Sequence, residues 1–307
     1  MRIAVVDLGT NSTRLLVANM TSQGGVEELE KRSTVTRLGQ GVDSSGRLAD
    51  EAMDRVFDVL SDYRELIDRH GADTIVALAT SAVRDSENGD EFRSTMQERF
   101  GFDARTISGD QEAQLTFLGA TKARQDRDEP TLVIDIGGGS TEFVVGRPGE
   151  APDFHVSTQS GAVRQTERHL HDDPPTPEQL DELKREARSI IEREVPAEVR
   201  DAVTRGIAVA GTATQLAAID QRLDPYDSSR VHGYTLSLDA CEAMLERLAS
   251  VALDERRMVT GLDPARAPTI VAGAAILVTA MRVFGLKSVE TSENDIMHGA
   301  ALTAAAA

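Results

Sequence analysis

The feature that most constrains the fold of this 307-residue chain is a short pattern that occurs twice. In each copy an apolar run ends in aspartate, a glycine-containing turn follows, and a second apolar run begins after a Ser-Thr pair. The first copy spans Asp7 to Thr13, and the second spans Asp135 to Thr141. Two apolar runs separated by glycine predict a tight β-hairpin. Because the two copies match position by position, they favour two similar domains over two unrelated hairpins.

The turns have the composition of phosphate-binding loops. Glycine lets the backbone approach a ligand closely and turn its N–H groups toward an anion. In the second copy Asp135 ends one strand and Glu142 begins the next, whereas the first copy has Arg14 at the position of Glu142. Carboxylates beside a phosphate need a metal ion between them, and Mg²⁺ suits oxygen ligands. The sequence therefore predicts a phosphate- or nucleotide-binding cleft between two domains.

The composition limits which binding partners and which cellular compartment the protein can have. The chain has 51 acidic and 33 basic residues, and its net charge of −18 argues against non-specific binding of nucleic acid or membranes. A phosphate site must therefore be a local positive patch. The single cysteine, Cys241, excludes an intramolecular disulfide, and no Cys/His spacing resembles a zinc site. Because neither a signal peptide nor an apolar run of about 18 residues is visible, we expect a cytoplasmic protein.

The length suits two domains of about 150 residues each. The polar stretch 123–130 predicts a boundary that gives domains 1–124 and 125–307, with the last helix, 293–305, packing back onto the first domain near the cleft. Apolar periodicity predicts strands and helices in both domains. The expected strands are 2–8, 12–20, 26–37, 74–79, 104–107, 131–136, 143–145, 153–158, 207–210 and 287–291. The expected helices are 49–70, 88–100, 111–124, one ending near 194, 237–250, 254–260 and 266–284.

Two further segments are candidates for anion binding. Thr80–Asp85 follows a buried strand, at the end where α/β proteins usually bind ligands. Gly211–Gln215 opens a helix after another strand, and a helix N-terminus favours negative charge.

Taken together, these segments closely resemble the exopolyphosphatase/guanosine pentaphosphate phosphohydrolase (Ppx/GppA) family. The resemblance is carried by segments 7–12, 79–84, 107–113 and 135–142, and later by 211–214 and 292–299. It implies an α/β fold of two ribonuclease-H-like domains of the actin-like ATPase superfamily, with an interdomain cleft. It also implies removal of a terminal phosphate from inorganic polyphosphate or guanosine pentaphosphate (pppGpp). The length matches the short, two-domain form of the family.

The resemblance also assigns expected roles. The family often has two acidic residues in the 107–113 segment. Here Gln111 replaces the first, which leaves Glu112 to orient or deprotonate the attacking water. Arg84 would bind the adjacent phosphate. Asp7 and Asp135 would hold Mg²⁺, or alternatively Mn²⁺, with Glu142 as a further ligand and catalytic candidate. The other expected phosphate-binding residues are Gly9, Thr10, Asn11, Ser12, Gly137, Gly138, Gly139, Ser140, Thr141, Arg164, Gly211 and Thr212.

Four functions stay open at this point. An exopolyphosphatase is preferred, and a pppGpp 5′-phosphatase is the near alternative because one cleft could serve both substrates. A kinase of the same superfamily is disfavoured because Glu112 stands where the family has a hydrolytic carboxylate. A non-catalytic phosphate or nucleotide sensor is disfavoured because binding alone needs no water-orienting acid. The resemblance also implies a homodimer, and the sequence shows no interface for it.

Overall fold

The structure is a computed structural model, and it describes residues 1–21, 24–124 and 129–306. The contacts divide the chain into two compact units. Unit 1 consists of Met1–Gly119 and Ile296–Ala307, and unit 2 consists of Ala120–Asp295. Residues 120–124 lie in unit 2 rather than in the predicted first domain. The C-terminal segment from Ile296, whose helix the sequence predicts to pack back onto the first domain, lies in unit 1. The C-terminal segment joins unit 1 because its apolar face packs on the first sheet.

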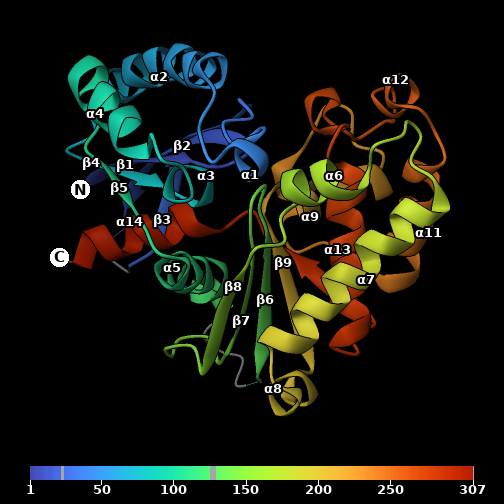
Figure 1. The fold of residues 1–307 in the computed structure, drawn as a ribbon. Helices are drawn as coiled ribbons and strands as arrows, with labels where there is room; N and C mark the ends of the chain where they lie inside the picture. The colour runs from blue at the N-terminus through green and yellow to red at the C-terminus, as the bar shows by residue number, and fades with distance from the viewer. Residues whose placement is uncertain (22–23, 125–128, 307) are drawn as a thin grey trace. The chain divides into compact units, whose positions relative to one another are not determined.

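The sheet of unit 1 has five strands in the order β3-β2-β1-β4-β5 (Figure 1). The strands are β1 (Arg2–Leu8), β2 (Ser12–Met20), β3 (Val26–Val35), β4 (Thr74–Ala79) and β5 (Ala104–Thr106). The first three form an antiparallel meander, and β4 and β5 continue the sheet in parallel to β1.

The alternation of side chains along β1 builds two cores in unit 1, one on each face of the sheet. Val6 and Leu8 pack with helices α2 (Asp50–His70) and α4 (Gly89–Phe100). Ile3 and Val5 point to the other face and pack with α14 (Ile296–Ala306). Because both faces are covered, β1 reads as a continuous apolar run up to Asp7.

The sheet of unit 2 has six strands in the order β10-β11-β9-β6-β7-β8. The strands are β6 (Thr131–Ile136), β7 (Thr141–Gly146), β8 (Phe154–Thr158), β9 (Arg205–Val209), β10 (Thr235–Ser237) and β11 (Ser288–Thr291). Strands β6, β7 and β8 are antiparallel, and β9 and β11 run parallel to β6. Without the edge strand β10, this order repeats that of unit 1. The predicted fold class, two ribonuclease-H-like α/β domains, is confirmed.

Helices cover the sheet of unit 2 with an aliphatic core. The apolar side of β6 at Leu132, Ile134 and Ile136 belongs to one cluster with the buried helix α13. Helix α7 begins at a capping box in which Thr176 and Gln179 bond each other's backbone N–H groups. The helices of this unit include α6 (Ala162–His169), α7 (Pro177–Glu194), α8 (Ala197–Ala202), α9 (Ala210–Asp220), α10 (Ser228–Val231), α11 (Leu238–Ala249), α12 (Leu253–Arg256) and α13 (Ile270–Val283). Among the described residues, no helix combines the length and apolarity needed to cross a membrane.

The main departures from the predicted elements are short or capped segments. Helix α6 and strand β10 were not predicted, and the short helix α1 (Val42–Ser45) lies in a predicted loop. The helix predicted at 266–284 begins at Ile270, because residues 264–266 form a 3-10 turn capped by Asp263.

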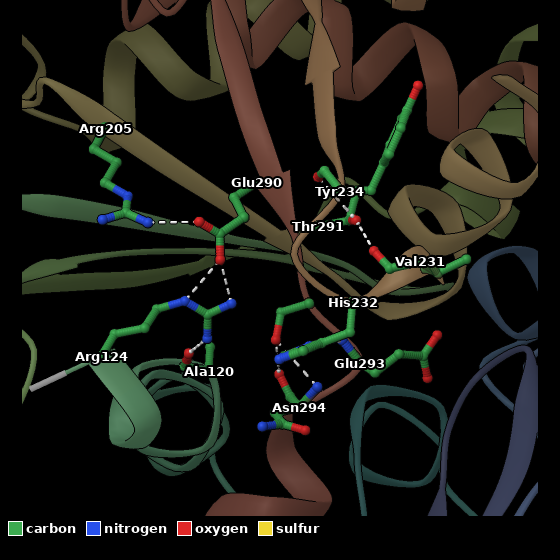
Figure 2. A network of polar contacts seen from close by, with 11 residues as sticks. Ala120, Arg124, Arg205, Val231, His232, Tyr234, Glu290, Thr291, Glu293 and Asn294 are labelled. Carbon is green, nitrogen blue, oxygen red and sulfur yellow. Dashed lines mark hydrogen bonds and ion pairs between the residues drawn. The ribbon is translucent and has the colours of Figure 1, made fainter. Parts of the chain in front are cut away.

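Both chain crossings between the units are anchored within unit 2 (Figure 2). After the first crossing, Arg124 donates to the Ala120 carbonyl and to Glu290 on β11. Arg205 of β9 donates to the other Glu290 oxygen at 2.6 Å. Before the second crossing, the Glu293 N–H donates to His232 Nδ1 at 3.2 Å. Strand β11 therefore bonds to the first crossing through Glu290, and the chain that follows β11 leads into the second crossing.

Candidate functional site

The candidate segments of unit 1 leave one edge of its sheet. Strands β1 and β4 are parallel, with Leu8 opposite Ala79, and the Ile107 N–H donates to the Ala79 carbonyl at 3.1 Å. The segments that follow β1, β4 and β5 therefore start side by side. They carry the glycine turn, Arg84 and Glu112, in agreement with the rule that ligands bind at the carboxyl ends of strands.

The turn after β1 directs backbone N–H groups to one side. The Gly9 N–H donates to the Ser12 carbonyl at 3.0 Å, and a Cβ on Gly9 would lie 2.8 Å from that oxygen. The carbonyls of Thr10 and Asn11 accept hydrogen bonds of 2.8 to 3.1 Å from N–H groups in segment 36–39. In a trans peptide the N–H points opposite to the carbonyl, so the Asn11 and Ser12 N–H groups point away from that segment. Such converging N–H groups suit an anion.

Ser12 adds a hydroxyl to this turn. Its side chain is buried, and its Oγ has no hydrogen-bond partner among the described residues. A buried hydroxyl without a partner costs free energy unless a ligand or water supplies the bond. Ser12 therefore suits contact with a bound ligand.

The turn after β6 repeats this arrangement with a helix in place of the loop segment. The Gly137 N–H donates to the Ser140 carbonyl at 3.0 Å. The Gly137 carbonyl accepts from the Ala162 N–H at 2.8 Å, and the Gly138 carbonyl accepts from the Val163 N–H at 2.8 Å and the Arg164 N–H at 3.1 Å. The Gly139 carbonyl accepts from Arg164 Nε at 2.9 Å. All three glycine carbonyls thus face α6, and the N–H groups that follow each of them face the opposite side.

Close contact between this turn and α6 requires glycine at the start of the helix. A Cβ on Gly161 would overlap the Gly138 carbonyl and would lie 2.5 Å from the Gly139 carbonyl carbon. The hydroxyl of Thr141, a residue predicted to contact phosphate, donates to the Ser160 carbonyl, and the Thr141 carbonyl accepts from Thr158 Oγ1 at 2.9 Å. Sequence reasoning assigned no role to Gly161. Only the close approach of two backbones reveals one.

The two hairpins differ in the residue opposite the strand-ending aspartate. Asp7 is the cross-strand partner of Arg14, and Arg14 Nε donates to Asp7 Oδ2 at 2.7 Å. Asp135 is the cross-strand partner of Glu142. Directly opposed residues of an antiparallel pair share a face and lie close together, so unit 2 holds two neighbouring carboxylates. Asp135 is 6% exposed and Glu142 is 1% exposed, and Ser157 Oγ donates to Glu142 Oε1 at 2.6 Å.

The donor set of unit 2 fits a divalent cation. Two buried carboxylates side by side repel each other unless a cation or proton lies between them, and their oxygens are the ligands that Mg²⁺ prefers. In unit 1 the guanidinium of Arg14 already neutralises Asp7. Within the described residues, no group of three or more His, Cys, Asp or Glu side chains forms a complete metal cage. Asp135 and Glu142 are therefore the pair of carboxylates that would hold such a cation.

Arg84 and Glu112 are brought together within unit 1. Arg84 lies at the end of the short helix α3 (Ser81–Arg84), and Glu112 lies in the first turn of α5 (Gly109–Thr121). Arg84 Nη1 donates to Glu112 Oε2 at 3.1 Å and to the Ile107 carbonyl at 2.9 Å. Glu112 is 8% exposed. The predicted phosphate ligand and the predicted water-orienting acid therefore form an ion pair.

The segment at the start of α9 has packing partners. Strand β9 runs parallel to β6 with Val209 opposite Asp135, so the segment starts at the same sheet edge as the glycine turn. A Cβ on Gly211 would overlap the Arg266 guanidinium, and a Cβ on Gly273 of α13 would overlap the Thr212 hydroxyl. Thr212 thus lies against α13, and Arg266, which the sequence did not single out, covers Gly211.

A comparison with family models gives one match over nearly the whole chain, the Ppx/GppA phosphatase family over residues 3–305. The chain belongs to this family. This member of the Ppx/GppA family is 35% identical to Exopolyphosphatase 2 of Mycobacterium tuberculosis, over 99% of this chain and 98% of that protein. It is also similar to solved structures. The Aquifex aeolicus Ppx/GppA family member has a TM-score of 0.82 at 27% identity, covering 100% of this chain and 98% of that one. An exopolyphosphatase from Cytophaga hutchinsonii has a TM-score of 0.89 at 25% identity, covering 99% and 97%.

Proposed function

We propose that this Ppx/GppA family member is an exopolyphosphatase, which hydrolyses the terminal phosphoanhydride of inorganic polyphosphate and releases orthophosphate. The observation that carries the proposal is the turn after β6, whose glycine carbonyls all bond to α6. The N–H groups that follow these carbonyls point away from α6 and can face an anion beside the buried Asp135–Glu142 pair. The identity to Exopolyphosphatase 2 supports polyphosphate as the substrate.

Phosphoanhydride hydrolysis depends mainly on positioning and on stabilising charge at the phosphoryl oxygens. The N–H groups that follow the glycine carbonyls would donate to the terminal phosphate, and Ser12 would do so from the turn of unit 1. Mg²⁺, or Mn²⁺ as the alternative, would be held by Asp135 and Glu142 and would neutralise charge on the phosphate. That both turns bind one phosphate stays a prediction of the duplicated pattern.

Arg84 and Glu112 would supply the remaining roles. A phosphate oxygen competes with Glu112 for the Arg84 guanidinium, because both are anionic acceptors. Binding of phosphate to Arg84 would then release the Glu112 carboxylate to orient or deprotonate the attacking water. The predicted homodimer and the cytoplasmic location belong to the same proposal.

One assay separates this function from the alternatives. Purified protein with Mg²⁺, with Mn²⁺ or with excess chelator would receive long polyphosphate, short polyphosphate, pppGpp, or ATP with sugars. We expect chelator-sensitive release of orthophosphate from polyphosphate. Release from pppGpp alone would favour the pppGpp 5′-phosphatase, and phosphorylation of a sugar would favour a kinase. Absence of orthophosphate release from every substrate would overturn the proposal.

A further inference from the structure

We propose that Arg164 is a positioning residue for the glycine turn of unit 2, and that it acts through its Nε–H bond to the Gly139 carbonyl. This inference rests on the proposed function, in which the turn binds a phosphate group. The sequence predicts a direct contact between Arg164 and phosphate. In this proposal Arg164 instead bonds the turn whose N–H groups bind the phosphate.

The backbone N–H groups at the start of α6 cannot hold the whole turn. A helix leaves its first N–H groups without partners inside the helix, and here those of Ala162, Val163 and Arg164 donate to the carbonyls of Gly137 and Gly138. The Gly139 carbonyl is bonded by a side chain instead, at 2.9 Å from Arg164 Nε. Arg164 therefore completes a row of donors that the helix backbone begins.

The bond from Arg164 Nε to the Gly139 carbonyl also fixes the direction of the Ser140 N–H, because of peptide geometry. The Gly139 carbonyl and the Ser140 N–H belong to one planar peptide and point in opposite directions. Glycine tolerates most backbone angles, so this peptide can turn over at low cost unless its carbonyl is bonded. The bond from Arg164 thus keeps the Ser140 N–H on the side away from α6, where it can donate to an anion.

The turn of unit 1 provides an internal comparison. Its two corresponding carbonyls, on Thr10 and Asn11, accept from backbone N–H groups of segment 36–39. Residues with a Cβ restrict the backbone there, whereas the unit 2 turn has three consecutive glycines. The bond from Arg164 Nε to the Gly139 carbonyl therefore holds the more flexible of the two turns.

Two substitutions distinguish the effect of the Arg164 Nε–H donor from the effect of the positive charge of Arg164. In Arg164→Gln, the amide Nε2 occupies the position of the arginine Nε, so an N–H donor can remain while the positive charge is lost. In Arg164→Lys, the charge remains but a methylene group occupies the Nε position. Arg168→Gln is the matched control, because Arg168 lies on the same helix and pairs with Glu186 at the surface.

The readout is kcat and KM for orthophosphate release from polyphosphate, together with the thermal unfolding midpoint. We expect R164Q to keep kcat within about 3-fold of the unchanged protein, and R164K to lose about 10- to 100-fold in kcat with a smaller change in KM. R168Q should match the unchanged protein.

Three results would overturn the positioning role. The first is an active R164K with an impaired R164Q, which indicates a charge contact with phosphate. The second is equal impairment of both variants, and the third is full activity of both. Calorimetric binding of inorganic tripolyphosphate to the same variants gives a second readout with the same expected order. If the unchanged protein binds tripolyphosphate but releases no orthophosphate, the proposed function fails while the binding order still tests Arg164.

Discussion

The contact between Arg84 and Glu112 gives the candidate acid a partner in the protein before any substrate is bound. Glu112 Oε2 accepts from Arg84 Nη1 at 3.1 Å, and the same nitrogen also donates to the Ile107 carbonyl at 2.9 Å. Arg84 is thus held at the end of β5 by a backbone contact that does not depend on Glu112. Removing the Glu112 charge should therefore leave Arg84 in place.

The isosteric change Glu112→Gln tests the water-orienting role. We expect kcat for orthophosphate release to fall about 10²- to 10⁴-fold, because a neutral amide cannot accept the proton of water. Circular dichroism and the unfolding midpoint should remain close to those of the unchanged protein. Asp110→Asn is the control, since Asp110 is exposed in the same helical turn, and its activity should change by less than about 2-fold. An E112Q variant that keeps most of its activity would exclude this role.

Cys241 illustrates how burial changes the chemistry of a residue. Its side chain is fully buried on α11, and desolvation raises the pKa of the thiol from 9.0 to about 12. The folded protein should therefore react very slowly with a thiol reagent at pH 8, and the unfolded protein should react at once. Because the pKa of the thiol is higher in the folded protein than in the unfolded one, ionisation of Cys241 does not reduce the stability of the fold below pH 9. The stability falls as the pH rises from 9 toward 12, where the thiol of the unfolded protein ionises first. Rapid labelling of the folded protein would contradict the burial of this thiol.

At the scale of elements, the strands and glycine turns could be predicted because their signals are local. Continuous apolar runs that lead into an aspartate mark β1 and β6 without any knowledge of the fold. The contact of α6 with the second turn could not be predicted, because more than 20 residues separate Gly138 from Arg164 and only tertiary packing joins them. The position of Thr212 against Gly273 is likewise a property of packing.

The carboxylate of Glu290 joins elements that are far apart in the sequence. Figure 2 shows Arg124 and Arg205 donating to its two oxygens. Arg124 is 6% exposed, and the two arginines lie at the end of the first crossing and on β9. Because a buried guanidinium without its carboxylate is costly, this cluster should be sensitive to the loss of Glu290.

We therefore expect Glu290→Ala to lower the free energy of unfolding by about 2 to 4 kcal/mol, measured by chemical denaturation. Glu242→Ala is the matched control, because Glu242 pairs with Arg282 at 2.8 Å on the surface, and its loss should cost less than about 1 kcal/mol. Equal effects of the two substitutions would mean that the Glu290 cluster contributes no more than a surface ion pair.

At the scale of the whole molecule, unit 1 is assembled from both ends of the described chain. Its C-terminal helix α14 packs on the face of β1 that carries Ile3 and Val5, and it also touches α5. A Cβ on Gly299 of α14 would overlap the Leu115 carbonyl of α5. Since α5 also carries Glu112, the fit between these two helices affects the candidate site as well as the core.

Gly299→Val should displace α14 from α5, because a backbone carbonyl cannot move aside as a side chain can. We expect a loss of about 2 kcal/mol or more in the free energy of unfolding, with a fall in activity. Ala305→Val adds similar bulk on the exposed side of the same helix and should have a small effect. Unchanged stability and activity of G299V would show that α14 and α5 adjust freely to each other.

The two-piece construction of unit 1 has a consequence for biosynthesis. The ribosome makes the sheet of unit 1 before unit 2, and makes the helix that covers this sheet, α14, only after unit 2. Unit 2 is continuous and has every residue of its own core once Asp295 has emerged. One apolar face of the nascent N-terminal sheet must therefore stay uncovered while the whole of unit 2 is synthesised. A chaperone would find the largest exposed apolar surface during that interval.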